Sequence, residues 1–353
     1  MTLFKSAFAR TVFAKLLMDW FAIGRELSPK ARGIVTLCSF LLPLAVWSAF
    51  SYLPFLWHPL MEVTESGDSR YFRSGMTVER EAFDQENTRL SSTDSELVKG
   101  IPTNPVYLPA PHEVGKAFYT AFITEPRLPG DPWLHESLWH SIQVIFWGFL
   151  LSSIIGVPLG ILCGAYSPIA RLFEPFIDFV RYMPAPAFGA LAVAIVGIYD
   201  GPKIAIIFIG TFFQQVLVIS NTTRGLDRAL VEAAQTLGAG KLQLLTRVAL
   251  PGILPDLYRD LRILLGWAWT YLIVAELVGA KTGITAFIHQ QSKYKVYENV
   301  YAAIIMIGLI GLFVDIMLGA LGSRLFPWEK DSKPGIFTSI AKALGLSKEA
   351  NPS

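Results

Sequence analysis

Residues 232–238 read Glu-Ala-Ala-Gln-Thr-Leu-Gly, and residues 248–251 read Val-Ala-Leu-Pro. This stretch decides the fold because of where it lies: it belongs to a polar segment that long apolar runs precede and follow. A helix of this composition in the middle of a membrane protein is hard to explain as a surface that faces lipid. Its position instead indicates an element that contacts a partner in water.

The residue types in this stretch agree with a docking role. Glu232 offers a carboxylate to basic groups or backbone donors of a partner, and Ala233 and Ala234 allow another surface to approach closely. The composition predicts a helix that Gly240 can end, while Gly238 permits a sharp turn into a second short helix. The sequence therefore predicts a compact two-helix loop.

The composition of the chain is that of a membrane protein. Of its 353 residues, 52% are hydrophobic and 16% are charged, whereas soluble domains carry about 25% charged residues. Apolar runs of about 20 residues are long enough to cross a bilayer as helices. The six expected spans lie near 33–57, 137–164, 169–199, 202–220, 257–280 and 299–323. Pro184 and Pro186 should break or kink the third span.

Lysine and arginine predict the orientation of these spans, because cytoplasmic loops are rich in both. Basic residues gather in the N-terminal flank, at Arg171 after the second span, in the loop after the fourth span and in the C-terminal flank. Six spans place these four regions on one side, so both termini are expected in the cytoplasm. The other face carries Asp200 with Lys203, and three further lysines there are outnumbered.

The predicted organisation has five parts, of which the polar insert at 58–110 is the least typical of a membrane protein. Residues 58–110 carry nine acidic side chains and few apolar ones, which is too polar to form much of a core alone. Either a partly ordered loop or a surface for an external partner fits this composition. The five parts are a cytoplasmic amphipathic segment at 1–32, a first transmembrane helix at 33–57, an external insert at 58–110, a core of five transmembrane helices at 111–328 with a cytoplasmic loop at 221–256, and a cytoplasmic tail at 329–353.

The docking stretch resembles the EAA loop of permeases from binding-protein-dependent ABC importers. The likeness covers roughly residues 107–328 and is closest to the nitrate, sulfonate and taurine type. Its other elements are Leu108-Pro-Ala-Pro111, the glycine-rich run 141–164, Arg181-Tyr-Met-Pro184, Ala275-Glu-Leu-Val-Gly-Ala280 with Gly283, and Pro327-Trp328. The chain departs from the family at Gly283-Ile284-Thr285, where Gly-Leu-Gly is usual, and in the length of its external insert.

The resemblance implies a fold, a mechanism and partners. The fold would be all-α, a polytopic membrane protein with a type I ABC importer-like permease core in a bacterial inner membrane. Two permease copies, expected to be a homodimer, would form the pathway, two ATPase subunits would bind ATP and magnesium, and an external binding protein would deliver a small oxyanion or organic anion such as nitrate, sulfonate, taurine or bicarbonate. The residues implied in ATPase coupling are Glu232, Ala233, Ala234, Gly238, Leu250 and Pro251.

This chain itself is expected to be a transport subunit and not an enzyme. A phosphate-binding loop needs Gly-x-x-x-x-Gly-Lys-Ser/Thr, and the nearest match, at 279–282, lacks both glycines in the required places. Cys38 and Cys163 lie in apolar runs, and no Cys/His cluster has metal-binding spacing. We expect no cofactor on this chain, contact with membrane lipid and no nucleic-acid partner.

Polar side chains inside the spans are candidates for the transport pathway, because polar groups in hydrocarbon are costly. The candidates are Gln143, Arg181, Gln214, Gln215, Trp267 and Glu276. Structural roles remain open for several of them: Asp178 and Arg181 can pair on one helix, Glu276 can bind a structural partner, and Trp267 can pack between helices.

Two other functions remain open at this point. An ion-coupled secondary carrier would use the intramembrane acids Asp178, Glu276 and Asp315, although no second half of the chain repeats the first. A membrane scaffold that transports nothing is supported only by the external insert.

Overall fold

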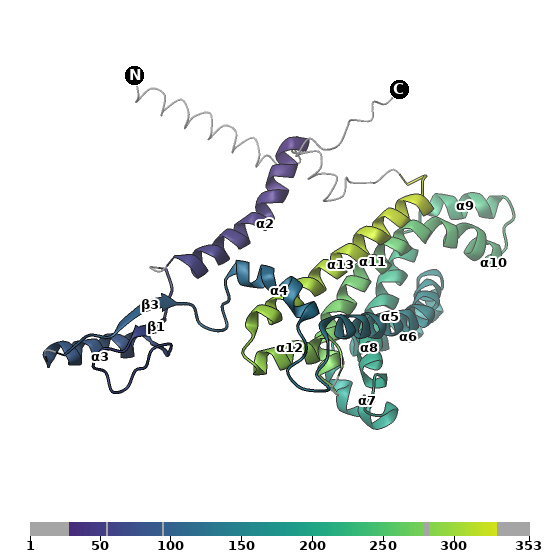
Figure 1. Cartoon of the computed structure of the whole chain (residues 1–353). Coiled ribbons are helices and arrows are strands. Elements are labelled where there is room, and N and C mark those ends of the chain that lie inside the picture. The colour runs from purple at the N-terminus through teal and green to yellow at the C-terminus, as the bar shows by residue number, and fades with distance from the viewer. Residues whose placement is uncertain (1–27, 54–55, 94, 279–281, 330–353) are drawn as a thin grey trace, which may run out of the picture. The chain divides into compact units, whose positions relative to one another are not determined.

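A computed structural model describes residues 28–53, 56–93, 95–278 and 282–329 (Figure 1). The expected amphipathic segment up to residue 27 and the tail beyond residue 329 lie outside this part. The described chain is mainly helical, which agrees with the predicted class. The helices are α2 Pro29–Tyr52, α3 Arg80–Ser92, α4 Pro111–Ile123, α5 Leu134–Ala165, α6 Ser167–Val180, η1 Ala185–Phe188, α7 Gly189–Val196, α8 Gly201–Arg224, α9 Arg228–Thr236, α10 Lys241–Gln243, η2 Leu244–Ala249, α11 Leu250–Leu277, α12 Ile284–Lys293 and α13 Tyr297–Leu325.

Helix α2 belongs to a unit separate from residues 54–330. Its N-terminus is capped by Ser28, whose side chain accepts a hydrogen bond from the backbone N–H of Ala31 at 3.3 Å. Large apolar side chains such as Phe40 and Leu42 are more than half exposed in this chain. A helix that is apolar on all sides suits a bilayer or a helical neighbour.

The insert folds into a small α+β unit with its own apolar core, and the expectation that it is too polar to form much of a core alone was wrong. Strands β1 Leu60–Glu65, β2 Thr77–Glu79 and β3 Lys99–Thr103 form an antiparallel sheet in the order β2-β1-β3, with α3 beside it. Successive strand residues face opposite sides, so a few apolar residues suffice to make one buried face. That core consists of Met61, Val63, Val78, Phe83, Leu90 and Val98.

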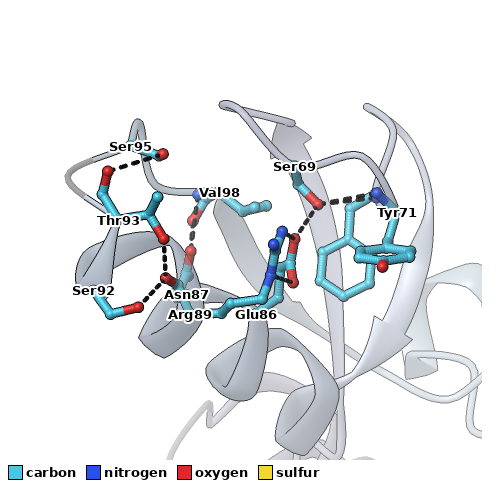
Figure 2. A network of polar contacts seen from close by, with 10 residues as sticks. Ser69, Tyr71, Glu86, Asn87, Arg89, Ser92, Thr93, Ser95 and Val98 are labelled. Carbon is cyan, nitrogen blue, oxygen red and sulfur yellow. Dashed lines mark hydrogen bonds and ion pairs between the residues drawn. The ribbon is translucent and has the colours of Figure 1, made fainter.

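A network of polar contacts connects α3 with the neighbouring loops of this unit (Figure 2). The carboxylate of Glu86 accepts hydrogen bonds from Arg89 at 2.7 and 2.8 Å and from the hydroxyl of Ser69 at 2.7 Å. The side-chain amide of Asn87 donates to the carbonyl of Val98 and accepts from its N–H. The bonds of Ser69 and Val98 tie α3 to the connection between β1 and β2 and to the segment before β3.

Helices α4 to α8 and α11 to α13 form the second helical part of the chain, in which α5 and α8 pack closely together. A side chain at Gly148 would come within 2.7 Å of Ile207, and one at Gly160 within 2.8 Å of Ile219, so the glycines of α5 allow the two helices to approach. Residues of α5, α8, α11, α12 and α13 share one buried apolar cluster.

Four described helices are long and apolar enough to cross a membrane: α2, α5, α8 and α13. The expected break at Pro184 and Pro186 is confirmed, because α6 and the segment η1–α7 meet at 88° and give a fifth span if the pair is counted as one. The fifth expected span, 257–280, coincides with α11. That helix is continuous, but charged residues from Asp256 to Arg262 occupy its first half, so its apolar part is short.

Candidate coupling loop and polar sites of the membrane core

The loop between α8 and α11 exposes a short helix. Asp227 caps α9 by accepting a hydrogen bond from the N–H of Ala229 at 2.9 Å. No residue of α9 is buried, and both Glu232 and Ala233 are exposed. Beyond the helix, the side chain of Leu237 is 89% exposed. A carboxylate and a large apolar side chain that share an exposed loop are suited to a protein partner.

Gly238, and not the expected Gly240, ends helix α9. Its φ of +85° is a left-handed conformation that L-residues rarely adopt. The N–H groups of Gly238 and Ala239 donate to the carbonyls of Gln235 and Ala234 at 2.9 and 3.0 Å, which closes the helix. No atom lies within 4 Å of the place that a Cβ would take, so the backbone conformation, and not space, requires glycine here.

The loop returns to the core through α10 and the π-helical turn η2, after which Leu250 and Pro251 begin α11. Leu250 is half-buried and Pro251 is exposed. The hydroxyl of Thr222 near the end of α8 donates to Asp260 of α11, which ties together the two helices that carry the loop. Both ends of the loop are therefore joined by a direct contact between α8 and α11.

Two pathway candidates have structural partners instead of an open surface. Gln215 is wholly buried, where its carbonyl oxygen accepts from Ser152 at 2.5 Å and its amide donates to Ser153 at 2.8 Å on α5. Glu276 is also wholly buried and accepts hydrogen bonds from the hydroxyl of Ser141 and, at 2.8 Å, from the N–H of Thr285. Gln143 is exposed on α5.

The bonds of Glu276 fix the beginning of α12. Ser141 also accepts from the N–H of Ile284 at 2.8 Å, so the carboxylate and the hydroxyl together hold two N–H groups of the first helical turn. Gly283 has a φ of +97°, and a Cβ there would lie 2.1 Å from the Glu276 carboxylate. A carboxylate at a helix N-terminus is also favoured by the helix dipole.

A second polar cluster, which the sequence did not indicate, forms around the buried Lys203 and includes the half-exposed Asp200. The Lys203 side chain is only 1% exposed, and its ammonium group donates to Asp200 at 3.0 Å and to the hydroxyl of Thr282 at 2.6 Å. The Nε2 atom of His140 lies 2.9 Å from the same carboxylate. The three-residue spacing of Asp200 and Lys203 is the only available signal, and the predicted topology places both residues on the non-cytoplasmic side without indicating that Lys203 is buried.

Three further candidates, Arg181, Gln214 and Trp267, line one cavity of about 140 Å³. Elements α6–η1, α8 and α11 supply these residues. The expected pairing of Arg181 is confirmed, because its Nε atom lies 2.7 Å from Asp178. Asp315 likewise pairs with Arg262 at 2.9 Å. The acids of the ion-coupled alternative are thus all engaged in local contacts.

Known proteins resemble the core of this chain. Residues 156–327 match the family described as binding-protein-dependent transport system inner membrane component. A probable ABC transporter permease of Brucella abortus strain 2308 is 32% identical over 228 residues, 65% of this chain and 88% of that protein. The taurine transport system permease of Escherichia coli K12 is 31% identical over 64% of this chain and 81% of its own length. The nitrate import permease of Leptolyngbya laminosa is 26% identical over 54% and 68%.

Proposed function

We propose the following function from one premise: this chain belongs to the family of inner membrane components of binding-protein-dependent transport systems. It is a multi-pass membrane protein and the permease subunit of an ABC importer. The resemblance inferred from the EAA stretch is thereby confirmed. What the chain contacts and carries is the subject of the proposals that follow.

We propose that α9 and the turn at Gly238 form the contact with the ATPase. The observation that supports this proposal is the exposed helix with its exposed Leu237, held between α8 and α11 by a glycine-dependent turn. Two ATPase subunits, which bind ATP and magnesium, would each engage one permease copy of a homodimer. Closure of the ATPases would then move α8 and α11 as rigid elements.

The loop must face the cytoplasm for this contact, which agrees with the lysine and arginine distribution. Both termini of the chain would then also be cytoplasmic, in the inner membrane of a bacterial cell. The insert at 58–110 would be external, on the side where a binding protein delivers substrate. Relatives named for taurine, aliphatic sulfonates and nitrate favour a small oxyanion or organic anion as the cargo.

The coupling proposal is tested by Gly238→Ala in the intact transport system. An L-residue held at this left-handed φ costs about 1–2 kcal/mol, so we expect co-purification of the ATPase to fall about tenfold. Gly240→Ala is the matched control, because its φ of −74° suits any residue and its nearest Cβ contact is 3.8 Å. The control variant should retain the ATPase.

Glu232→Ala tests the side chain instead of the backbone. We expect weaker ATPase docking and lower uptake, while Glu81→Ala, which removes an exposed acid of the insert, should change neither. If ATPase docking and uptake stay intact in both Glu232→Ala and Gly238→Ala, the loop is not the coupling element. Uptake that persists without any ATPase and collapses with the ion gradient would favour the secondary carrier.

A further inference from the structure

The cavity beside Arg181 has the lining of an anion site. Arg181 comes from the end of α6, Gln214 and Gly210 from α8, and Trp267 and Tyr271 from α11. Arg181, Gln214, Trp267 and Tyr271 carry N–H or O–H donors, whereas the fifth polar or aromatic side chain, Phe213, has none. Among the described residues that line the cavity, none is acidic. The lining therefore combines one permanent positive charge with neutral donors.

The contacts of Arg181 with Asp178 and Tyr182 leave other N–H groups of its guanidinium available to a ligand in the cavity. Asp178 contacts the Nε atom of Arg181 at 2.7 Å but does not line the cavity. One terminal nitrogen, Nη2, donates to the hydroxyl of Tyr182 at 3.0 Å. These contacts orient the guanidinium plane, and a planar guanidinium binds oxyanions in a two-point manner that a point charge cannot reproduce. Asp178 thus positions the arginine and reduces the cost of a charge in the membrane.

The size of the cavity limits the ligand. Its volume of about 140 Å³ is several times the roughly 30 Å³ that one water molecule occupies in the liquid. It is well below the roughly 300–1,000 Å³ of sites that enclose drug-sized molecules. The cavity can hold a three-oxygen head group with little else.

A close contact between two helices makes this space. A Cβ on Gly210 would lie 2.9 Å from the ring of Tyr271, so glycine allows the tyrosine to rest directly on α8. Any larger residue at position 210 would push Tyr271 aside and change the wall of the cavity. The shape of this wall of the cavity therefore depends on Gly210 and Tyr271.

We propose that this cavity is an anion-binding subsite of the transport pathway, in which Arg181 binds the sulfonate, carboxylate or nitrate head group of the cargo while Gln214, Trp267 and Tyr271 complete the donor set. This inference rests on the proposed function for the existence of a pathway. It goes further by assigning the charge selectivity of that pathway to one arginine.

The test uses the full-length chain in lipid nanodiscs with sodium methanesulfonate as the probe. A ligand that binds only the folded state raises the melting temperature with concentration. We expect such a rise in the wild-type chain relative to sodium chloride at equal ionic strength, up to about 100 mM. Arg181→Gln should weaken the response at least about tenfold.

Two further variants separate binding from folding. The double variant Asp178→Asn with Arg181→Gln removes both charges and keeps the segment neutral, and it should also lose the response. Arg262→Gln removes another arginine that pairs with an aspartate, Asp315, away from the cavity, and this variant should keep the response. A wild-type chain without a response, or an Arg181→Gln chain with an unchanged one, overturns the proposal.

Co-purification of the ATPase with the same variants distinguishes this proposal from the proposed function. Arg181→Gln should lose the methanesulfonate response and retain the ATPase. If neither the wild-type chain nor any variant retains an ATPase, the proposed function fails. The anion subsite is judged separately, by the methanesulfonate response alone.

Discussion

Glu276 is an acidic side chain with no solvent exposure in the last turn of α11, next to the start of α12. Such a group is costly unless its acceptor sites are used. Here Ser141 and the N–H of Thr285 use them, and Gly283 leaves room for the carboxylate. The contact at 285 is made by the backbone, which explains why threonine is tolerated where the family usually has glycine.

Truncation of Glu276 should release the start of α12. Glu276→Ala leaves two buried donors without an acceptor, and we expect a loss of about 2–4 kcal/mol in unfolding free energy. Hydrogen exchange should rise most in peptides that cover α12. Glu276→Gln keeps the volume and one acceptor oxygen, so about half of the loss should be recovered.

Asp256→Ala is the control for this series, because Asp256 lies on the same helix and its side chain is 57% exposed. An exposed ion pair contributes only about 0–1 kcal/mol, so this variant should melt close to the wild type. Equal effects of Asp256→Ala and Glu276→Ala would contradict the assigned role of the buried carboxylate.

At this scale the sequence predicted which residues are unusual but not what they contact. Glu276 and Gln215 were identified because polar groups in spans are costly, yet their partners Ser141 and Ser152 lie more than 60 positions away in the chain. For Lys203 the sequence predicted only the side of the membrane and not its burial. Its burial depends on Thr282, which tertiary packing alone brings near.

Among the elements, the insert differs most from its prediction. Its composition suggested a loop, because nine acidic residues outweigh the apolar ones. A three-stranded sheet with one helix needs only six buried apolar side chains when they alternate correctly. The membrane helices, by contrast, follow directly from apolar length and from the prolines that break the third span.

Acid should loosen the insert through Glu86. Hydrogen bonds from Arg89, and then from Ser69, lower the pKa of this carboxyl from its usual value of 4.5. A lowered pKa in the folded state means that the stabilisation is complete above about pH 4.5 and is lost as the pH falls through the folded-state pKa. Hydrogen exchange of the 60–103 peptides, corrected for the intrinsic rate, should therefore rise below pH 4.5.

Glu86→Gln should remove most of this pH dependence at a cost of about 1 kcal/mol at neutral pH. Glu81→Gln changes an exposed acid on the same helix and should leave the exchange profile of the wild type. An unchanged acid response in Glu86→Gln would show that another group controls the insert.

At the scale of the whole molecule, the insert is a folded unit that the chain enters and leaves at neighbouring points. Leu60 on β1 pairs with Thr103 on β3, and paired residues of antiparallel strands lie about 4.5–5.5 Å apart. The matched family region, 156–327, begins well after it. The geometry therefore permits removal of the unit without strain on the helices that follow.

Replacement of residues 60–103 by a flexible linker of about four residues, which reaches about 13 Å when extended, should leave the membrane core folded. We expect the variant to accumulate in the membrane, to co-purify with the ATPase and to keep maximal uptake within about twofold of the wild type, because insertions at such sites are tolerated. Deletion of α4 is the matched control, since its Val114 and Ala117 are 2% and 1% exposed and its loss should prevent folding. A linker variant that fails to accumulate would mean that the insert is part of the core's fold, and one that binds the ATPase but transports nothing would place the insert in the transport step itself.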